Sequence, residues 1–299
     1  MPLVIGLFSI LKPYRQISYV EQPNSKTYTK WWVILKIVQH YKVQVLKDKV
    51  AIISGASRGI GFHMSKEFAD RGATVIMCSR SKARAENSSG LINGVTHPEK
   101  LDVTNAQGIG EFVARVAARH KHIDILINNA GYPFDRAMWN KRFHQVTEED
   151  LNRVIDVDLR GTFRLSQAII PLMLKNSNSN GTAGGVIINT ASTPAVSGHT
   201  AGAPYSIAKS GVIAITKHIA LEYGDKNIRA YTLALGNIST EATFASMTLT
   251  ERKRAAMENS MKRWGDPREV ATIAANLASD DFSFSTGNTI IIDGGMVML

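Results

Sequence analysis

From residue 47 onward the chain alternates short apolar runs with longer mixed stretches. Runs of this length, rich in Ile, Val and Leu without strict alternation of apolar and polar positions, are typical of strands covered on both faces. Six such runs occur, at 49–55, 73–79, 124–130, 185–192, 228–235 and 288–294. A weaker strand is expected to end within "KLDVT" at 100–104.

The stretches between these runs predict helices near 60–71, 106–119, 147–175, 203–223 and 267–279. Two of these helices carry start signals: Thr147 precedes an acid three residues later, and Asp266 stands before Pro267 at a first helical position. Strands and helices in this order imply an α/β fold with a doubly wound parallel sheet of about seven strands and helices on both faces. Ligands of such sheets bind at the carboxyl ends of the strands.

Residues 1–47 differ from the rest, so we expect an N-terminal extension followed by a single domain over 48–299. The extension holds seven Lys or Arg and one acid, Glu21, which places six of the ten net positive charges there. Its apolar run at 3–11 is too short to span a bilayer, has no basic flank before it and is followed by no small-residue cleavage site, so a secretory signal is disfavoured.

Three roles stay open for this extension. Its second apolar run, at 31–46, is aromatic and basic and can lie on a membrane surface or dock on the body of the protein. The acid-poor composition also fits a transit peptide, although Arg15 is the only arginine. An extension with no folded role is equally compatible. We therefore expect a cytoplasmic protein, with the mitochondrial matrix or membrane association through residues 1–47 as alternatives.

Charge, cysteine and histidine exclude several classes of function. The net charge of +10 invites a nucleic-acid hypothesis, but residues 48–299 carry only +4 and show no basic stripe with interleaved aromatics, so we expect no nucleic-acid partner. The single cysteine, Cys78, excludes an intrachain disulfide and, within an apolar run, indicates a packed thiol in a reducing compartment. The eight histidines show no metal-ligand spacing, so we expect no metal.

The first strand leads directly into a glycine-rich turn, "SGASRGIG" at 54–61. Gly55, Gly59 and Gly61 allow a tight turn, a close backbone approach to a diphosphate and close packing of the next helix. The N-terminus of that helix then offers unpaired N–H groups to the phosphates. Glycine trios also serve ordinary turns, but this one lies between a first strand and a helix, as a dinucleotide site requires.

The end of the second strand distinguishes two forms of such a dinucleotide. An acid there binds the ribose 2′-hydroxyl of NAD, whereas an arginine accommodates the 2′-phosphate of NADP. Here Ser79 is followed by Arg80, and Arg58 lies inside the glycine turn. We therefore expect NADP(H) to be preferred, with NAD(H) as the alternative.

Tyr205 and Lys209 stand one helical turn apart in "APYSIAKSG" at 203–211, so they share one face of the predicted helix. Alone, the pair is most simply a solvated face. A free tyrosine phenol has a pKa of about 10, which is too high for easy proton exchange near neutrality. An ammonium about 4 Å from a phenolate, at an effective dielectric of about 20, stabilises it by at most about 4 kcal/mol, and desolvation opposes part of that.

Several features coincide in a fixed order along residues 48–299. They are the glycine turn, "NNAG" at 128–131 after a strand, Ser192 thirteen residues before a tyrosine, and Tyr205-x-x-x-Lys209. "DVT" at 102–104 and "IDGG" at 292–295 fit as well. Together they resemble the short-chain dehydrogenase/reductase family. The resemblance implies a single-domain Rossmann-type fold that moves hydride between a nicotinamide and an alcohol or carbonyl carbon.

By this resemblance, Tyr205 gives a proton to the carbonyl in reduction, Ser192 hydrogen-bonds the substrate oxygen, and Lys209 binds the ribose and makes the phenol a stronger acid. Asn128 and Gly131 are expected to line the cofactor. The cofactor-binding set implied is Gly55, Ser57, Arg58, Gly59, Ile60, Gly61, Arg80, Asp102, Val103, Asn129, Ala130, Gly131, Tyr205, Lys209, Gly236, Ile238 and Thr240, with Asp102 and Val103 flanking the adenine.

Two positions depart from the family pattern. Asp158 stands where the family commonly has an Asn that supports a water-mediated proton path to the lysine. An ionised Asp accepts but cannot donate hydrogen bonds, so either the path is rewired, with Asp158 as a fourth catalytic residue, or the substitution is structural. Leu235 stands where a Pro often precedes Gly236, which we expect to loosen that loop without abolishing binding.

The segment 239–267 is expected to supply substrate contacts, since the family places them after the sixth strand. Met247, Met257 and Met261 can line an adaptable apolar pocket, although helix packing is the commoner use of Met. The basic run at 252–254 can attract a phosphopantetheine carrier or another anion, or can be a solvated charge run. His199 can contact substrate.

The ending "IDGG" and "MKRWGDPREVA" at 261–271 are similar to those of 3-oxoacyl-carrier-protein reductases and general alcohol dehydrogenases. We therefore expect reduction of a small-molecule carbonyl, with a 3-oxoacyl thioester on a carrier protein or CoA as the leading candidate. The alternatives are a non-catalytic nicotinamide-binding regulator and a membrane-associated lipid or steroid dehydrogenase. The resemblance further implies a homotetramer or homodimer through the helices at 147–175 and 203–223.

Overall fold

The computed structural model describes residues 45–176 and 184–298, all within one compact unit, Lys42–Leu299. The expectations for residues 1–44 therefore lie outside the described residues. Leu46, which the sequence placed in the extension, is fully buried in the core, and its backbone N–H donates to the carbonyl of Arg71 at 3.0 Å. The packed part of the chain therefore already includes Leu46.

Seven parallel strands form one sheet in the order β3-β2-β1-β4-β5-β6-β7. They are β1 (Val50–Ser54), β2 (Thr74–Ser79), β3 (Thr96–Lys100), β4 (Ile125–Asn128), β5 (Gly185–Ser192), β6 (Ile228–Leu235) and β7 (Thr289–Ile292). The predicted doubly wound, Rossmann-type α/β sheet is confirmed. The strand order reverses between β1 and β4, and a crevice at this point is where such sheets bind their ligands.

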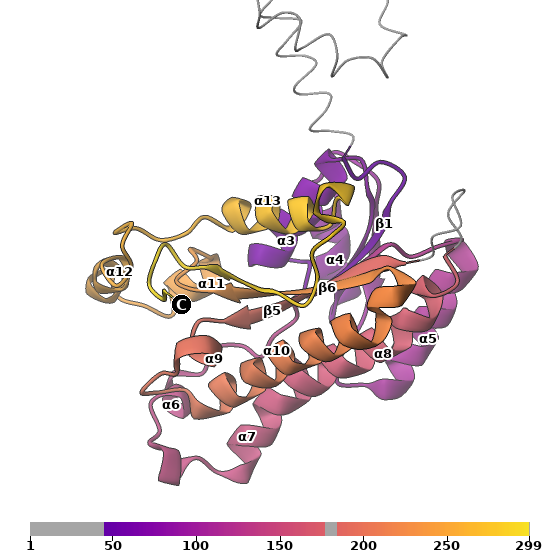
Figure 1. Ribbon diagram of the computed structural model, residues 1–299. Helices are drawn as coiled ribbons and strands as arrows, with labels where there is room; N and C mark the ends of the chain where they lie inside the picture. Colours follow the sequence, from indigo (N-terminus) through magenta and orange to yellow (C-terminus); the bar gives the residue numbers. More distant parts are fainter. Residues whose placement is uncertain (1–44, 177–183, 299) are drawn as a thin grey trace, which may run out of the picture. The chain divides into compact units, whose positions relative to one another are not determined.

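Helices cover both faces of this sheet (Figure 1). They are α3 (Gly59–Asp70), α4 (Lys82–Ser89), α5 (Ala106–Arg119), α6 (Arg136–Trp139), α7 (Glu148–Val154), α8 (Gly161–Met173), α9 (Pro194–Ser197), α10 (Ala203–Tyr223), α11 (Glu241–Ala245), α12 (Leu249–Ala256) and α13 (Pro267–Leu277). Short 3₁₀ turns are η1 (Phe143–Gln145), η3 (Gly224–Lys226) and η4 (Asp280–Phe282), and η2 (Ile155–Arg160) is π-helical.

Two apolar cores explain why the strand sequences do not alternate. Ala51 and Ile53 of β1 pack in the core under α3 and α13, whereas Val50 and Ile52 pack in the core under α5, α8 and α10. Both faces of a central strand are thus removed from water, so both sets of positions are apolar. Cys78 lies in the second core, where burial raises the pKa of its thiol far above the usual value, as expected for a packed thiol.

The helix start signals are confirmed in atomic detail. Thr147 and Asp150 form a capping box at α7, and Asp266 and Glu269 form one at α13. The single helix expected over 147–175 is wrong in one respect, because η2 separates α7 from α8. The sequence also missed α4, whose residues "KARAENSS" are polar and show little apolar periodicity.

Residues 45–176 and 184–298 contain neither a membrane-spanning helix nor a cluster of metal-binding side chains. No helix there is both long and apolar enough to cross a membrane. In the same residues, no three His, Cys, Asp or Glu side chains gather as a metal ion would require.

Candidate active site

The glycine turn between β1 and α3 has a backbone that only glycine adopts easily. Gly55 and Gly59 have φ angles of +66° and +55°. A Cβ atom on Gly61 would lie 2.3 Å from the carbonyl oxygen of Gly55 and 2.5 Å from Nδ2 of Asn129. Gly55 and Gly59 are therefore required by the backbone conformation of the turn, and Gly61 by the close packing of the turn against the end of β4.

The N-terminus of α3 is open to an anion. Its N-cap residue, Arg58, is exposed and makes no side-chain cap, and the first turn contains no acid. The first N–H groups of α3 therefore have no partner from a cap, and the helix dipole favours a negative charge there. Thr240 lies beside the turn, since a Cβ on Gly59 would meet its Cγ2 at 3.6 Å. This backbone fits the diphosphate of a dinucleotide.

Three hydrogen bonds hold the turn in place. The backbone N–H of Ala56 donates to the Cys78 carbonyl at 2.9 Å, and Ser88 Oγ donates to the Ser57 carbonyl at 2.7 Å. The hydroxyls of Ser79 and Ser57 lie 3.2 Å apart. Ile60, which follows the turn, packs against the core under α3 and α13. The turn is thus tied to the end of β2 and to α4, the same region that carries Arg80.

Ser54 organises the end of β4, a role that the sequence did not single out. Its hydroxyl donates to the Ile127 carbonyl at 3.2 Å and accepts the backbone N–H groups of Asn129 and Ala130, each at 3.0 Å. The Asn129 amide in turn donates to the carbonyls of Ser54 and Gly55 at 3.1 and 3.2 Å. The predicted residues Asn129 and Ala130 are therefore locked against the glycine turn.

Asn128 was expected to line the cofactor, but its side chain lies in the interior. It is 4% exposed, and its amide donates to Ser166 Oγ at 2.9 Å and to Asn189 Oδ1 at 2.8 Å. Asn189 continues the chain of hydrogen bonds to Thr216 of α10 at 2.9 Å. Asn128 therefore braces β4, β5, α8 and α10 against one another.

The residues expected around the adenine gather after β2 and β3. Burial alone would raise the pKa of Asp102, but hydrogen bonds from the Thr104 backbone and hydroxyl and the nearby charges of Arg80 and Lys100 lower it. Asp102 thus accepts hydrogen bonds from Thr104 and lies close enough to Arg80 for their charges to attract. Val103 is buried, and it would collide with any Cβ on Gly161, at 2.7 Å. Arg80 itself is exposed.

Tyr205, Lys209 and Asp158 come together as the sequence predicted. Lys209 is 4% exposed, and its Nζ lies 5.7 Å from the centre of the Tyr205 ring. The ammonium donates to the Thr190 carbonyl of β5 at 2.9 Å and lies 3.5 Å from Oδ2 of Asp158, which is fully buried. Tyr205 is half-buried. The solvated-face alternative for Tyr205 and Lys209 is therefore wrong, because the lysine points into the protein.

Asp158 is positioned by the π-helical turn η2. Its Oδ1 accepts the backbone N–H of Tyr132 at 2.6 Å, and its carbonyl accepts the Thr162 hydroxyl at 2.7 Å. A Cβ on Gly131 would lie 3.4 Å from the same Oδ1, so Gly131 closes over the carboxylate. Short π-helical insertions of this kind often occur at functional sites.

The buried pair fixes the charge of the lysine. Burial alone would lower the pKa of the Lys209 ammonium, but the Asp158 carboxylate and the Tyr205 phenol outweigh it and raise the pKa above its usual value. Lys209 therefore stays charged at neutral pH. Oδ2 of Asp158 accepts no hydrogen bond from the described residues, and the Lys209 ammonium at 3.5 Å is the cation paired with it there.

Ser192 ends β5, two residues after the carbonyl that anchors Lys209. Its hydroxyl donates to the Leu235 carbonyl at 3.1 Å, and the same carbonyl accepts the Thr193 N–H at 3.0 Å. The backbone N–H of Gly236 donates to the Ile292 carbonyl at 3.0 Å. Leu235 is thus held between β5 and β7, and hydrogen bonds fix the loop that the sequence expected to be loosened by the missing Pro.

The remaining predicted cofactor residues follow β6. Ile238 is buried and pairs with Gly265 as a short parallel bridge. Thr240 caps α11, accepting the Thr243 N–H at 3.1 Å. This segment, the glycine turn and the end of β4 all lie at the carboxyl ends of the strands, where the fold predicts a ligand.

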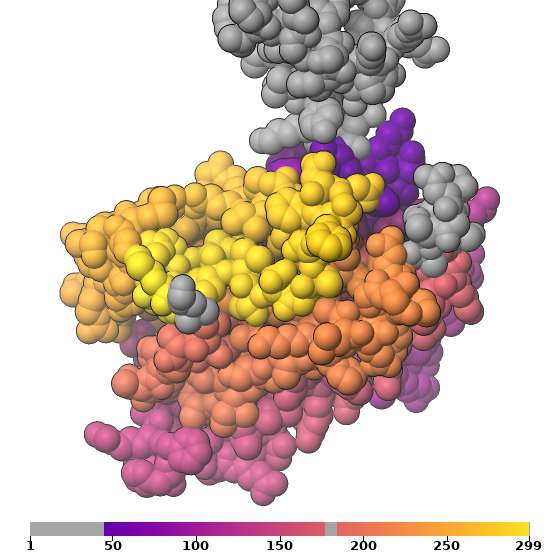
Figure 2. Space-filling model, viewed as in Figure 1, coloured from indigo at the N-terminus to yellow at the C-terminus, as the bar shows by residue number. Residues whose placement is uncertain are grey.

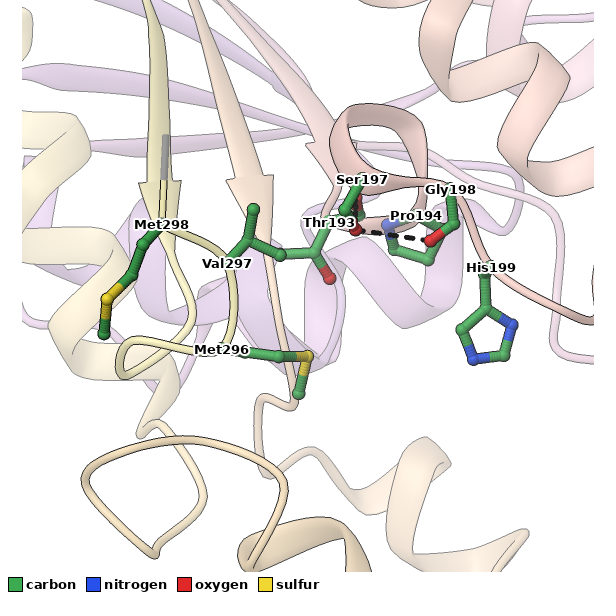
Figure 3. A pocket seen from close by; sticks show the side chains of 8 residues that line it. All are labelled: Thr193, Pro194, Ser197, Gly198, His199, Met296, Val297 and Met298. Atoms are coloured by element: carbon green, nitrogen blue, oxygen red, sulfur yellow. Dashed lines mark hydrogen bonds between the residues drawn. The ribbon is translucent and has the colours of Figure 1, made fainter.

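A pocket of about 350 Å³ opens one residue beyond Ser192 (Figure 3). It is lined by Thr193, Pro194, Ser197, Gly198, His199, Met296, Val297 and Met298. In the space-filling view the yellow C-terminal residues lie beside the salmon residues that follow β5, in agreement with this lining (Figure 2). His199 therefore lies where the sequence expected a substrate contact.

The methionines of this pocket are not those that the sequence suggested. Met257 and Met261 are 57% and 59% exposed, and neither lines the pocket. The pocket uses Met296 and Met298, which follow the "IDGG" motif. The three residues of the basic run at 252–254 lie in different environments. The Arg252 guanidinium stacks on Phe244, 4.7 Å from its ring centre, whereas Lys253 and Arg254 are exposed.

The site thus combines a phenol beside a buried ammonium, a serine hydroxyl at the end of β5, and a glycine turn that suits a dinucleotide diphosphate. A phenol kept near a fixed cation is suited to exchanging a proton with a substrate oxygen. A dinucleotide at the same strand ends can exchange hydride with the carbon.

Comparison with known proteins agrees with this geometry. Residues 55–297 match the family model described as enoyl-(acyl carrier protein) reductase. The 3-oxoacyl-[acyl-carrier-protein] reductases FabG of Thermotoga maritima and Vibrio cholerae are 37% and 34% identical to this chain, each over 85% of it and 99% of the relative. Glucose 1-dehydrogenase 2 of Bacillus subtilis is 31% identical, over 85% of this chain and 96% of the relative. The chain belongs to the short-chain dehydrogenase/reductase family of NAD(P)-dependent oxidoreductases.

Proposed function

We propose that this enzyme reduces the 3-oxo group of an acyl thioester with NADPH. The observation that carries the proposal is the buried Lys209 ammonium, fixed between the Thr190 carbonyl and the Asp158 carboxylate beside the half-buried Tyr205 phenol. Such a phenol can give a proton to a carbonyl oxygen and recover it without large movement. The reaction class follows from the family, and the substrate follows from the relatives and the pocket.

Each residue has a defined task in this proposal. The Ser192 hydroxyl releases the Leu235 carbonyl and donates to the substrate oxygen, which orients the carbonyl. Tyr205 donates its proton to the same oxygen as negative charge develops there. Lys209 stabilises the resulting phenolate and binds the ribose of the nucleotide. The bound nicotinamide supplies the hydride that the carbonyl carbon receives, so the products are a secondary alcohol and the oxidised nucleotide.

The glycine turn, Ser57, Arg58 and the N-terminus of α3 would hold the diphosphate. Asn129, Ala130 and Gly131 would line the nucleoside on the β4 side, and Gly236, Ile238 and Thr240 would contact the nicotinamide carboxamide. Asp102 and Val103 would flank the adenine. The N-terminus of α3, which has no cap of its own, fits an anionic group better than a neutral one.

Preference for NADPH over NADH rests on two exposed arginines. Ser79 ends β2 where an acid would select the 2′-hydroxyl of NAD, and Arg80 follows it. Arg58 lies in the glycine turn, which the Ser57 and Ser79 hydroxyls tie to the end of β2. Both are free to turn toward a 2′-phosphate.

The 3-oxoacyl substrate is supported by two FabG relatives that span almost the whole domain. The glucose dehydrogenase relative is nearly as similar, so identity alone does not select the substrate. The pocket beside Ser192 supports an acyl chain, because Pro194, Met296, Val297 and Met298 give it apolar walls and its lining contains no Asp, Glu, Lys or Arg. A polyol would leave many hydroxyls without partners there.

Assembly and location belong to the proposal as well. Phe163 of α8 and Ile207 and Leu221 of α10 are 51%, 44% and 87% exposed. Apolar side chains on these helices support a homodimer or homotetramer through them, as the family implies. A cytoplasmic location suits a carrier-protein or CoA thioester.

One observation favours a second candidate, a nicotinamide-binding protein without turnover. Asp158 neutralises Lys209 at 3.5 Å and so weakens the field that the lysine exerts on Tyr205. If the cancellation were complete, the fold would bind the nucleotide but catalyse poorly.

A cofactor and substrate screen separates the candidates. Purified protein is incubated with NADPH or NADH and acetoacetyl or 3-oxooctanoyl thioesters, simple ketones, a steroid ketone or, for oxidation, glucose with NADP⁺. We expect NADPH-dependent reduction of the 3-oxoacyl thioesters, and loss of about 100-fold or more of that rate in Tyr205→Phe with NADPH binding retained. Nucleotide binding without turnover on any substrate favours the regulator; full turnover in Tyr205→Phe removes that residue from the mechanism.

A further inference from the structure

An aromatic residue outside the predicted site lies against the proposed proton donor. Trp139 ends α6, a short helix in the segment that follows β4, and it is half-buried. Its ring centre lies 5.8 Å from that of Tyr205, with the planes at 57°. Tilted rings at this separation are in favourable contact.

A second neighbour of the indole belongs to the pocket. The ring of His199 lies 5.4 Å from that of Trp139, with the planes at 48°, and His199 lines the pocket together with Met296 and Met298. Phe134, which is 52% exposed, lies 5.7 Å from the same indole. Trp139 is therefore the link that joins the surface of the pocket to the Tyr205 phenol.

The indole is held in place by the start of α10. The Gly202 N–H donates to the Trp139 carbonyl at 2.9 Å, and a Cβ on Gly202 would lie 2.4 Å from the indole ring. Gly202 has a φ angle of +71° and is the N-cap of the helix that carries Tyr205. The ring, the helix start and the phenol therefore form one packed unit, and the indole is pre-organised as a wall.

We propose that Trp139 determines substrate specificity: its indole is the wall against which the apolar substituent of the carbonyl substrate lies on its way from Tyr205 to Met296 and Met298. This inference rests on the proposed function and adds the selected substrate class, carbonyl compounds with a medium-length acyl chain. The pocket volume of about 350 Å³ is within the range of small-molecule sites. Aromatic and thioether surfaces gain from methylene groups, and they offer little to the hydroxyls of a sugar.

The effect of the indole should appear as a preference for longer acyl chains. Each fully buried methylene contributes about fourfold in affinity. Between a four-carbon and an eight-carbon acyl group, we expect the wild type to prefer the longer chain by about 10-fold or more, because only part of the chain lies against the wall. In Trp139→Ala this preference should fall below about threefold, and Trp139→Phe should keep most of it.

The test measures binding and turnover separately. Isothermal titration calorimetry with butanoyl- and octanoyl-N-acetylcysteamine, with and without NADP⁺, gives the affinity ratio without any reaction. The matching 3-oxoacyl thioesters with NADPH give the ratio of kcat/KM. Phe143→Ala is the matched control, because Phe143 is 77% exposed in the same segment and should leave both ratios unchanged. Thermal unfolding establishes that each variant is folded.

The outcomes distinguish the inference from the function on which it rests. Equal losses for short and long chains in Trp139→Ala would mean that the indole only positions Tyr205, and would overturn the inference, as would a wild type without chain-length preference. If Trp139→Ala reduces 3-oxoacyl thioesters with the same preference for the longer chain as wild type, the proposed function stands and the role of Trp139 in specificity is wrong. A lost binding preference in a protein that turns over none of these thioesters would keep the wall and reject the function.

Discussion

Replacing Asp158 by Asn tests the electrostatics of the proposed site with a change of one charge. The carboxamide has nearly the shape of the carboxylate, and its oxygen can keep the hydrogen bond from the Tyr132 N–H, which is 2.6 Å long in the wild type. What is lost is the negative charge 3.5 Å from Lys209 Nζ. Asp158 is fully buried, so water does not replace that charge.

The distances give the size of the effect. Lys209 Nζ lies 5.7 Å from the Tyr205 ring centre, so at an effective dielectric of about 20 it stabilises a phenolate by about 3 kcal/mol. The two distances place Asp158 Oδ2 within about 9 Å of the same ring, where its charge opposes the phenolate by about 2 kcal/mol. Removing that opposition corresponds to a shift of about 1 pH unit or slightly more.

The assay is the pH dependence of kcat/KM for reduction of acetoacetyl thioester by NADPH. Reduction requires the protonated phenol, so kcat/KM falls at high pH as the phenol loses its proton. We expect this alkaline limb to lie about 1 pH unit lower in Asp158→Asn, with the plateau rate within about 10-fold of wild type. Asp156→Asn is the control, because Asp156 lies in the same turn, but its side chain is 42% exposed and is paired with Arg160.

Three other outcomes would contradict this electrostatic role of Asp158. If removal of Asp158 discharged the buried Lys209, the phenolate would lose its cation and the alkaline limb would move to higher pH. An unchanged limb would show that the carboxylate does not act on the phenol at all. A collapse of the plateau with an unshifted limb would assign Asp158 a specific task in the proton path.

Three further predictions concern the glycine turn, the choice of cofactor and the surface ion pair between Arg136 and Glu251. Gly61→Ala should lower the free energy of unfolding by about 1–3 kcal/mol and weaken NADPH binding, because its Cβ would lie 2.3 Å from a backbone oxygen. The control Gly110→Ala, whose Cβ would have nothing within 4 Å, should raise the free energy of unfolding by about 0.5–1 kcal/mol. Denaturant titrations measure both changes. Arg80→Ala should weaken NADPH binding by roughly 10- to 100-fold and leave NADH binding unchanged in fluorescence titrations, and equal losses would contradict its role at the 2′-phosphate. The hydrogen bond from Arg136 is the main cause that lowers the pKa of Glu251 from its ordinary 4.5 to about 2, so the stability that this pair contributes is present above pH 4.5 and is lost as the pH falls toward 2. In thermal unfolding, Glu251→Gln should remove this loss of stability between pH 4.5 and 2. A variant whose stability falls with pH as the wild type's does would contradict the prediction.

The sequence predicted the fold because its strands lie between two cores. Ile52 and Ile53 are adjacent in the chain and point to opposite cores, and both are apolar, which is the pattern of a covered parallel strand. β3 gave a weak signal because its residues, "THPEK", are polar and include a proline. It lies at an edge of the sheet, where one side has no neighbouring strand.

The π-helical turn was not predictable from the sequence, since "VIDVDLRGTF" continues the apolar spacing of the flanking helices. Its presence depends on tertiary contacts, including the bond from the Tyr132 N–H to Asp158. For the same reason, the sequence could mark Asp158 as a departure from the family pattern but could not show that the carboxylate faces Lys209.

The pocket beside Ser192 was not predicted from the sequence, and the expectation that residues 239–267 contact substrate stays a prediction. The methionines of 239–267 drew attention by their number, whereas Met296 and Met298 follow β7, which is separated from β5 by β6 alone, and so meet the residues after β5. Trp139 is the one tryptophan in the segment 131–145, and that residue in the loop after a strand of the predicted site was the signal that could have found it. Ser54 could have been found as the hydroxyl that directly precedes the glycine turn.

The proposed chemistry is tested most directly by following the hydride. Acetoacetyl thioester is incubated with NADPH deuterated at the transferable position of C4, and the product is examined by mass spectrometry after a single turnover by wild type and Tyr205→Phe. We expect one deuterium on the carbinol carbon with wild type and a rate about 100-fold or more lower with the variant. A product without deuterium would exclude direct hydride transfer, and a variant that transfers it at the wild-type rate would exclude Tyr205 as the proton donor.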